Sequence, residues 1–421
     1  MVRKFNDWFR THDYTIEDLV KDFQKWYEID KEDIEIVLCA ICDREIVPDV
    51  KLWFVVINNS GGMKSEFSKI LKDCNFIYTL DTLTPNTLVS GKVYKDKETG
   101  ELIPVKGLLT KMDGKVLLIK DGSMILTLHQ DKRREIFGQL RTLADGYIER
   151  GYGNLPDKVR VEGHIGFIMF STPWIDDFTT LQALLGTRFL RHRMRFKVKA
   201  VMRKIRLNFN KEDNIRNDLG FVVQYFLAKK FNEVLLPTVS DFWLKRIEDL
   251  ALYVGKMRTQ VKCEWWKGDI VAIVREPSEE IPSRLYKQFI KLGMLLSLIR
   301  GKKEFTEKEW DTLVRVGEDS ITPYVRSKIL KRYLKNNYRF TTQEEIAEQL
   351  KVSRKCVSVH LKLMEGCLLV DESYELTKET KALMEKVYEN PKLLEAIQSQ
   401  PIRPQIVKGA IPIDKLMPKR D

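Results

Sequence analysis

The chain has 421 residues, which is long enough for two or three domains that each bury a core. Hydrophobic residues make up 43% and charged residues 31%, and no run of about 18 uncharged apolar residues occurs, which excludes a membrane-spanning protein. The net charge of +12 favours a polyanionic partner, nucleic acid before membrane. The first residues lack the uninterrupted apolar core of a signal peptide, so we expect a soluble, cytoplasmic protein.

The first segment, residues 1–45, is predicted to be helical. "TIEDLVKDFQKW" (15–26) begins with a threonine cap and places acids in its first turn, beside the positive end of the helix. The next helix, "KEDIEIVLCAICDREI" (31–46), contains Cys39 and Cys42 as a C-x-x-C. No second such pair and no histidine pair completes four zinc ligands, so we expect buried, reduced thiols.

Residues 46–205 are predicted to form an α/β domain. Three apolar runs, "LWFVVIN", "KVLLIKD" and "IGFIMFS", alternate with the helical runs "KSEFSKILKD" and "DKRREIFGQLRTLADGY". Apolar strands without in–out alternation indicate a sheet that is buried on both faces. Strands that alternate with helices make that sheet mostly parallel.

Residues 206–325 are predicted to be a mostly helical lid domain. "SDFWLKRIEDLALYVGKMR" and "SRLYKQFIKLGMLLSLIRG" carry apolar residues at three- and four-residue spacing. A polar interruption with Pro277 and Pro282 separates them.

Residues 326–385 are predicted to form a winged helix-turn-helix domain. A threonine-capped helix ends in a turn at Lys351, a second helix begins at Ser353, and "CLLVDESYELT" (367–377) supplies the wing. The second helix would offer four residues to DNA: Arg354, Lys355, Ser358 and Lys362. The alternative for this domain is a protein contact. The tail at 386–421 is predicted to be flexible, or ordered only against a partner.

The stretch "FVVINNSGGMKSEF" has the outline of a phosphate-binding loop between a buried strand and a helix. The usual spacing G-x-x-x-x-G-K-[ST] needs glycines at two positions where this chain has Asn58 and Met63. Asn58 tolerates a left-handed backbone better than most residues, and Met63 needs only helical angles if the helix begins there. The candidate nucleotide-binding residues are Asn58, Asn59, Ser60, Gly61, Gly62, Met63, Lys64, Ser65 and Glu66.

Polar residues follow the later strands in an order that strengthens this interpretation. Asp121 ends one buried strand, where a nucleotide site needs an acid directed at a metal ion, and Ser171 and Thr172 end another. Arg188 then follows in "LLGTRF". Together these positions have the layout of an AAA+ ATPase.

The loop "NNSGGMKSEF" resembles that of the minichromosome-maintenance (MCM) helicases, which also have a non-glycine residue before the lysine and a serine after it. More closely, the chain resembles the MCM-like AAA+ ATPases of phages and mobile elements over roughly residues 30–370. The matching segments are "TLTPNTLVSG", "GLLTKMDGKVLLIKDGSMILTLHQDKRREIFGQLRTLADGY", "LLGTRFLRHRM" and "EIPSRLYKQFIKLGMLLSLIRG".

The resemblance implies a P-loop AAA+ core, ATP and Mg²⁺ as ligands, and a role for each position. Lys64 and Ser65 would hold phosphate and Mg²⁺, and Asp121 would be the acid of the second nucleotide motif. The remaining roles are a first sensor at Thr172 or Ser171, an arginine finger at Arg188 that reaches the neighbouring subunit, and a second sensor at Arg284. A finger supplied in this way completes the site only in a ring or filament.

One departure from the family concerns hydrolysis. Most AAA+ enzymes have two acids at the end of this strand, whereas this chain has Lys120 and Asp121 followed by glycine. Glu135 could substitute from the next helix, although a surface salt bridge is its more ordinary role. Nucleotide binding is therefore better supported by the sequence than fast hydrolysis.

The leading interpretation is an oligomeric, DNA-binding AAA+ ATPase, an MCM-like replicative helicase or related motor of a mobile element, whose tail could bind other replication proteins. The basic stretch at 188–206 could line a DNA channel or be a solvated basic face. A second interpretation is an ATP-regulated initiator, loader or regulator on DNA with little or no hydrolysis. A third is an assembly factor with a vestigial nucleotide site.

Overall fold

The computed structural model describes ten stretches of the chain, residues 13–46, 50–89, 93–95, 98, 102–104, 107–151, 159–177, 188–232, 235–267 and 269–388. These residues form two compact units. The first unit takes in the described residues of 1–238 together with 294–304, and the second those of 239–293 and 305–402. No helix in these stretches is both long and apolar enough to cross a membrane.

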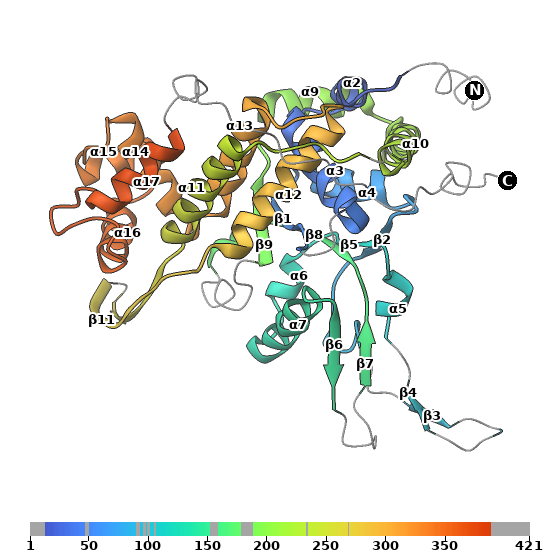
Figure 1. Cartoon of the computed structure of the whole chain (residues 1–421), viewed down its shortest axis with the longest axis horizontal. Helices are drawn as coiled ribbons and strands as arrows, with labels where there is room; N and C mark the ends of the chain where they lie inside the picture. Colours follow the sequence, from blue (N-terminus) through green and yellow to red (C-terminus); the bar gives the residue numbers. More distant parts are fainter. Residues whose placement is uncertain are drawn as a thin grey trace. The chain divides into compact units, whose positions relative to one another are not determined.

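The first unit is built on a five-stranded parallel sheet with the strand order β2–β5–β8–β1–β9 (Figure 1). Its strands are β1 (Trp53–Ile57), β2 (Ile77–Leu80), β5 (Val116–Ile119), β8 (Gly166–Ser171) and β9 (Phe189–Arg193). Every residue of β1, β5, β8 and β9 is buried, as expected for a parallel sheet covered on both faces. The sequence-based prediction of an α/β fold is thus confirmed.

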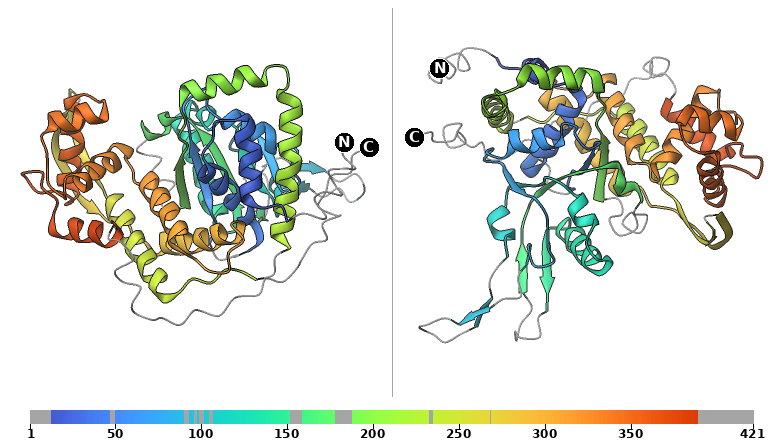
Figure 2. Two further views of the ribbon diagram at one scale, coloured as in Figure 1. Left: turned by 90° about the horizontal axis from the view of Figure 1, so that it is seen from above. Right: turned by 180° about the vertical axis from the view of Figure 1, so that it is seen from behind.

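Helices cover both faces of the sheet (Figures 1 and 2). On one face the ring of Trp53 lies 5.3 Å from that of Phe167, within a core completed by α5, α6 and α7. On the other face Phe170 stacks on Phe67 of α4 at 6.3 Å, and Phe67 stacks on Phe23 of α2. These helices are α2 (Ile16–Trp26), α3 (Lys31–Ile46), α4 (Lys64–Leu71), α5 (Leu109–Met112), α6 (Ser123–Leu126) and α7 (Gln130–Leu143).

Buried polar contacts tie α3 to more distant parts of the first unit. Asp33 Oδ1 lies 2.7 Å from Nε2 of His192 in β9, and both side chains are buried. Glu35 accepts two hydrogen bonds from Arg300, which follows α12, at 2.9 and 2.6 Å. The expected burial of Cys39 and Cys42 in α3 is confirmed, since both thiols are fully buried.

The remaining elements of the first unit extend from the sheet or lie beside it. Two antiparallel hairpins that the sequence reading did not predict are β3–β4 and β6–β7, of which β6–β7 projects from the sheet (Figure 1). The bounds are β3 (Val93–Lys95), β4 (Leu102–Pro104), β6 (Tyr147–Arg150), β7 (Val159–Glu162), the 3₁₀ turn η1 (Pro173–Asp177), α9 (Val198–Asn208) and α10 (Glu212–Phe231). In the structure α10 packs against α2 and α4, and the boundary at 205/206 stays a prediction.

The second unit contains an element that the sequence reading missed. An antiparallel ribbon of β10 and β11 lies between α11 and α12 in the chain. The sequence predicted only a polar interruption of a helical region there. Strand formers such as Val261, Trp265 and Val271, on either side of the sequence Lys-Gly-Asp, account for the ribbon. The elements of the second unit begin with α11 (Asp241–Met257), β10 (Gln260–Trp266), β11 (Asp269–Ser278), α12 (Ser283–Ile299), whose end belongs to the first unit, and α13 (Glu307–Ser320).

The two helices predicted for the helix-turn-helix are present as α15 (Gln343–Leu350) and α16 (Arg354–Gly366). They lie between α14 (Tyr324–Lys335) and α17 (Lys378–Tyr388), and α17, which the sequence reading did not predict, continues past the expected start of the tail at 386. Thr342 caps α15, and the turn residue Lys351 is left-handed, with a φ of 55°. In place of the predicted two-stranded wing, the structure has an isolated antiparallel bridge between Val370 and Leu376. The assignment as a winged helix stays a prediction, as do the other domain boundaries.

Candidate functional site

The predicted phosphate loop connects the carboxyl end of β1 to the first turn of α4. The Asn58 N–H donates to the Ser171 carbonyl oxygen at 3.0 Å, which joins the loop to the end of the neighbouring strand β8. Met63 has helical angles, as predicted. The proposed reason for Asn58 was wrong, because the left-handed residue of the loop is Gly61, with a φ of 79°. Asn58 instead packs against Gly62, where an added Cβ would lie 2.5 Å from Asn58 Nδ2.

Gly61 and Gly138 form a matched pair for a stability test, because an added Cβ at either position meets no atom within 4 Å. Gly61→Ala should lower the free energy of unfolding by about 1 kcal/mol through its backbone conformation. Gly138→Ala, inside α7, should raise it by about 0.5–1 kcal/mol. Thermal unfolding of both variants beside the parent protein measures the two effects. A lower unfolding temperature in both variants would contradict this prediction.

Lys64 is the first residue of α4, and its side chain is buried, with 7% exposed. Burial lowers the pKa of the Lys64 ammonium, and the charge of Asp121 partly opposes that shift. Lys64 and Asp121, both predicted site residues, therefore come together at the carboxyl ends of the strands. Within the described stretches the ammonium has no ion pair and no hydrogen bond. Such a cation at a helix N-terminus fits an anionic ligand such as a phosphate.

Asp121 and Thr172 belong to one small network at the same edge. The Ser123 N–H donates to Asp121 Oδ1 at 3.0 Å, and Ser123 Oγ lies 3.2 Å from Thr172 Oγ1. Lys120 forms an ion pair of 2.9 Å with Asp81, which follows β2. The Ser65 hydroxyl and the Asp121 carboxylate are the oxygen groups that would hold Mg²⁺ beside a phosphate.

A cavity of about 310 Å³ adjoins the phosphate loop. It is lined by Tyr27, Glu28, Gly61, Gly62, Met63, Ser65, Glu66, Val201, Lys204, Ile205, Asn208, Glu212 and Arg216. The helix α9 is fixed to the end of α2 beside this cavity, because Lys204 Nζ donates to the carbonyl oxygens of Gln24 and Lys25 at 2.6 and 2.8 Å. The loop, the end of α2 and the helix α9 thus enclose a space large enough for a base and its sugar.

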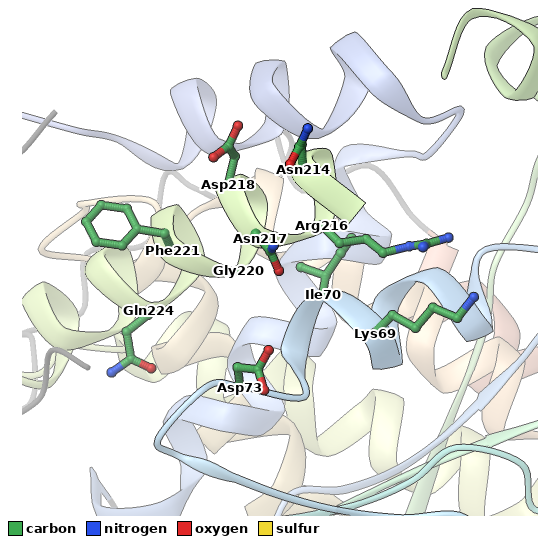
Figure 3. Close-up of a pocket in the computed structure, with 10 residues that line it drawn as sticks. All are labelled: Lys69, Ile70, Asp73, Asn214, Arg216, Asn217, Asp218, Gly220, Phe221 and Gln224. Carbon is green, nitrogen blue, oxygen red and sulfur yellow. The ribbon is translucent and has the colours of Figure 1, made fainter. Parts of the chain in front are cut away.

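Glu66, next to Ser65, connects the loop to α10. Its carboxylate accepts from Arg216 Nε at 2.8 Å and Nη2 at 3.0 Å, and from the Tyr27 hydroxyl at 3.2 Å. These contacts outweigh burial, so the pKa of Glu66 is lowered. Arg216 also borders a second cavity of about 680 Å³, whose lining comes from the end of α4, from Asp73 beyond it, and from α10 as far as Gln224 (Figure 3).

Arg188 lies at the amino ends of the strands, whereas Lys64 lies at their carboxyl ends. It precedes β9, whose first residue pairs with Trp53 at the start of β1, whereas Lys64 follows the end of β1. A five-residue strand spans about 16 Å, so Arg188 is not brought to the phosphate loop of its own chain. Its Nη2 donates to Asp145 Oδ2 at 3.1 Å.

Glu135, considered as a substitute for the missing second acid, forms an ion pair with Arg150 of β6. The expectation that Glu135 makes a salt bridge is therefore confirmed.

The basic stretch at 188–206 divides into two parts with different roles. Arg191 and Arg193 in β9 are buried and both donate to Asp176 Oδ1, at 2.8 and 2.7 Å. In contrast, α9 exposes three bases: Lys199, Arg203 and Arg206. The arginines of the β9 half therefore support the sheet, and the solvated basic face considered from the sequence can apply only to α9.

The four residues predicted to contact DNA lie on α16 in the second unit, and two of them already have partners. Arg354 Nε is 2.8 Å from Glu344 Oε1, and Lys355 Nζ is 3.3 Å from Asp269 Oδ2 of the ribbon. Lys362 is exposed and Ser358 half-buried. The DNA-binding role of these residues and the second-sensor role of Arg284, in the first turn of α12, stay predictions.

Several residues around the loop were not identified from the sequence. Tyr27, Val201, Asn208 and Arg216 come from three separate segments, and no local motif marks them. Of these residues, only Arg216 belongs to a recognisable pattern, a basic residue in a helix whose first turn contains acids. That pattern is too common in helices to identify a site residue.

The fold and site together describe a mixed α/β protein whose five-stranded parallel sheet is consistent with the core of a P-loop ATPase. No model of a known protein family matches the sequence, and no curated protein matches it either. The structure is similar to that of a candidate ATPase from Cytophaga hutchinsonii ATCC 33406, at 11% identity and a TM-score of 0.43, over 80% of this chain and 94% of that one. Similarity at this level assigns neither an activity nor a family to this chain.

Proposed function

We propose that this protein is an oligomeric AAA+ ATPase that binds DNA, an MCM-like replicative helicase or helicase-related motor of a mobile element. The observation that carries the ATPase part is the buried Lys64 at the N-terminus of α4, with the charge of Asp121 acting on it and a cavity beside the loop. Strands β1, β5 and β8 are neighbours, so the loop, Asp121 and Thr172 occupy one edge, the place where open parallel sheets bind ligands.

Two features support self-association. Arg188 lies at the edge opposite its own loop, where it could act only on the nucleotide of a neighbouring subunit. The helix α9 also exposes Val198 and Met202, and Phe209 directly after its last residue is exposed as well. Exposed apolar side chains grouped in this way are typical of a surface that another protein covers. The proposed partner is a second copy of the chain, in a ring or filament.

The arrangement at Asp121 favours one alternative, an ATP-regulated initiator, loader or regulator on DNA with little or no hydrolysis. The residue before Asp121 is a lysine, Lys120, which pairs with Asp81, and the candidate second acid, Glu135, is held in an ion pair with Arg150. In this alternative, ATP would assemble the protein on DNA and would persist there.

The deciding experiment is ATP binding and steady-state hydrolysis by the full chain, with and without single- and double-stranded DNA. DNA-stimulated turnover is expected for the motor. Tight ATP binding without turnover would replace the motor with the regulated switch. If the protein neither binds nor hydrolyses ATP at high protein concentration, the proposal is overturned and the nucleotide site is vestigial.

The exposed bases of α9 provide the test of DNA contact. Replacement of Lys199, Arg203 and Arg206 by alanine should weaken DNA binding about tenfold or more at moderate salt, because each phosphate contact adds almost one unit to the slope of log affinity against log salt. Fluorescence anisotropy at several salt concentrations measures the DNA affinity and the slope of log affinity against log salt. As a matched control, Lys111, Lys132 and Arg134 can be replaced in the same way. An unchanged slope in the α9 variant would remove this helix from the DNA contact.

A further inference from the structure

One face of the β10–β11 ribbon is exposed and carries a tryptophan. Side chains along β10 alternate between the two faces of the ribbon, so Lys262, Glu264 and Trp266 share one face. The Trp266 ring is 65% exposed, and Val271 and Val274 of β11 are half exposed or more. Apolar side chains grouped in this way are costly to leave in water, which is typical of a surface that a ligand covers.

The opposite face of the ribbon packs on α16, and the two lie side by side in the second unit (Figure 1). Gly366 is the last residue of α16, and an added Cβ there would lie 2.5 Å from Ile273 Cδ1 and 3.5 Å from Val261 Cγ2. In the first turn of the helix, Lys355 Nζ donates to the Lys267 carbonyl oxygen at 3.3 Å. The helix α16 therefore lies along the ribbon from one end to the other.

The ribbon has the position beside α16 that the sequence predicts for a wing. The wing predicted at 367–377 is represented in the structure by one bridge, between Val370 and Leu376. The ribbon, in contrast, is a two-stranded element, and its contact with α16 joins Lys267 to Lys355, which are 88 positions apart. It is therefore the β element that accompanies the helix predicted to contact DNA.

Positive charge gathers at the end of the ribbon where Trp266 pairs with Asp269. Lys267 Nζ lies 5.8 Å from the centre of the Trp266 ring. Lys355 Nζ is 3.3 Å from Asp269 Oδ2, so the charge of this acid is neutralised from α16. An ammonium group has three donors, so Lys355 can keep both of its contacts with the ribbon and donate to a ligand as well. A nucleotide fits this arrangement, because its base is flat like the ring and its phosphate is an anion.

We propose that this ribbon binds single-stranded DNA, with Trp266 stacking on an unpaired base and the ammonium groups of Lys267 and Lys355 contacting the adjoining phosphates. The inference rests on the proposed function, since it assigns the form of the DNA and a contact surface apart from the exposed bases of α9. The bases of a duplex are stacked on one another, whereas an unpaired base offers a free face to an aromatic ring. Phosphates are present in both forms of DNA, so the ring accounts for the selection of single strands.

The test uses the full chain and measures fluorescence anisotropy with three labelled probes: oligothymidylate, an abasic strand of the same length, and a duplex of that length. The ratio of the affinities for oligothymidylate and the abasic strand should be about tenfold lower in Trp266→Ala than in the parent protein. Trp266→Phe keeps a ring and should retain most of the ratio. Because the Trp266 ring is exposed, its removal leaves the core intact, and duplex affinity should not change.

Two further variants separate stacking from charge. Lys267→Asn removes the ammonium and inserts a residue that accepts the φ of 48° at this position. It should keep the ratio of the two single strands and reduce the slope of log affinity against log salt by about 0.7. Tyr338→Ala is the matched control, because Lys381 Nζ lies 5.9 Å from the centre of that ring, and it should keep both the ratio and the slope.

An unchanged ratio in Trp266→Ala, with tight binding of all three probes, would overturn the inference and leave DNA binding by the protein intact. A loss of duplex affinity equal to the loss for oligothymidylate would also overturn it, because the ring would then not act on an unpaired base. If Trp266→Ala instead formed smaller assemblies in sedimentation and kept the ratio, the ribbon would be a contact between copies of the chain. If the parent protein bound no probe, the DNA-binding part of the proposed function would fail together with this inference.

Discussion

Lys64→Met is expected to weaken ATP binding about 100-fold, because the charge-assisted contact of a buried ammonium with phosphate is lost. In the same variant the protein without nucleotide should unfold about 2–4 °C higher. Burial disfavours the charged form of Lys64 and lowers its pKa, so folding at neutral pH carries a cost that methionine removes. The measurements are calorimetric titration with ATP and thermal unfolding in its absence.

The sign of the stability effect follows from the direction of the pKa shift. A lysine whose pKa is lower in the folded than in the unfolded protein destabilises the fold below the folded pKa, and this penalty disappears as pH rises above the ordinary value of 10.5. The stability gain of Lys64→Met should therefore be full at neutral pH and shrink in alkaline solution. Lys72→Ala, an exposed lysine at the end of α4, should change neither property. A lower unfolding temperature for Lys64→Met would show that the ammonium already has a stabilising partner.

Three of the five strands and their polar ends could be predicted because each depends on a short stretch of sequence, whereas β2, β9 and the order of the strands in the sheet were not predicted. The apolar runs of β1, β5 and β8 and the turn into α4 are local patterns, and they placed Lys64 and Asp121 at one edge. The hairpins were missed for a related reason. The runs of β3, β4, β6 and β7 are three or four residues long, too short for a periodic pattern to distinguish them from loops.

Contacts between distant segments could not be predicted from local patterns. The pairing of Glu66 with Arg216 joins residues 150 positions apart, and that of Asn208 with Trp26 joins residues 182 positions apart. The same limit applies to the basic stretch, where the sequence shows charge but not that Asp176 neutralises Arg191. The walls of the cavity therefore become visible only in the structure.

Arg188 is the residue whose placement has the largest consequence for turnover. At the amino end of β9 it is separated from its own phosphate loop by the length of the sheet, and its partner there is Asp145. If it acts as an arginine finger, each site needs Lys64 from one subunit and Arg188 from the next. Loss of either residue then stops hydrolysis, but the two losses fall on different sides of the subunit interface.

Arg188→Ala is accordingly expected to lower ATP turnover about 10³-fold while leaving ATP affinity close to that of the parent protein. An equal mixture of Arg188→Ala and Lys64→Ala subunits should recover activity, since about a quarter of randomly formed interfaces contain an intact pair. Arg160→Ala, an exposed arginine paired with Glu162, serves as the control and should keep full turnover. Hydrolysis rates of each variant and of the mixture are the measurement. Without recovery in the mixture, Arg188 would have a role within its own subunit, and its ion pair with Asp145 would then be structural.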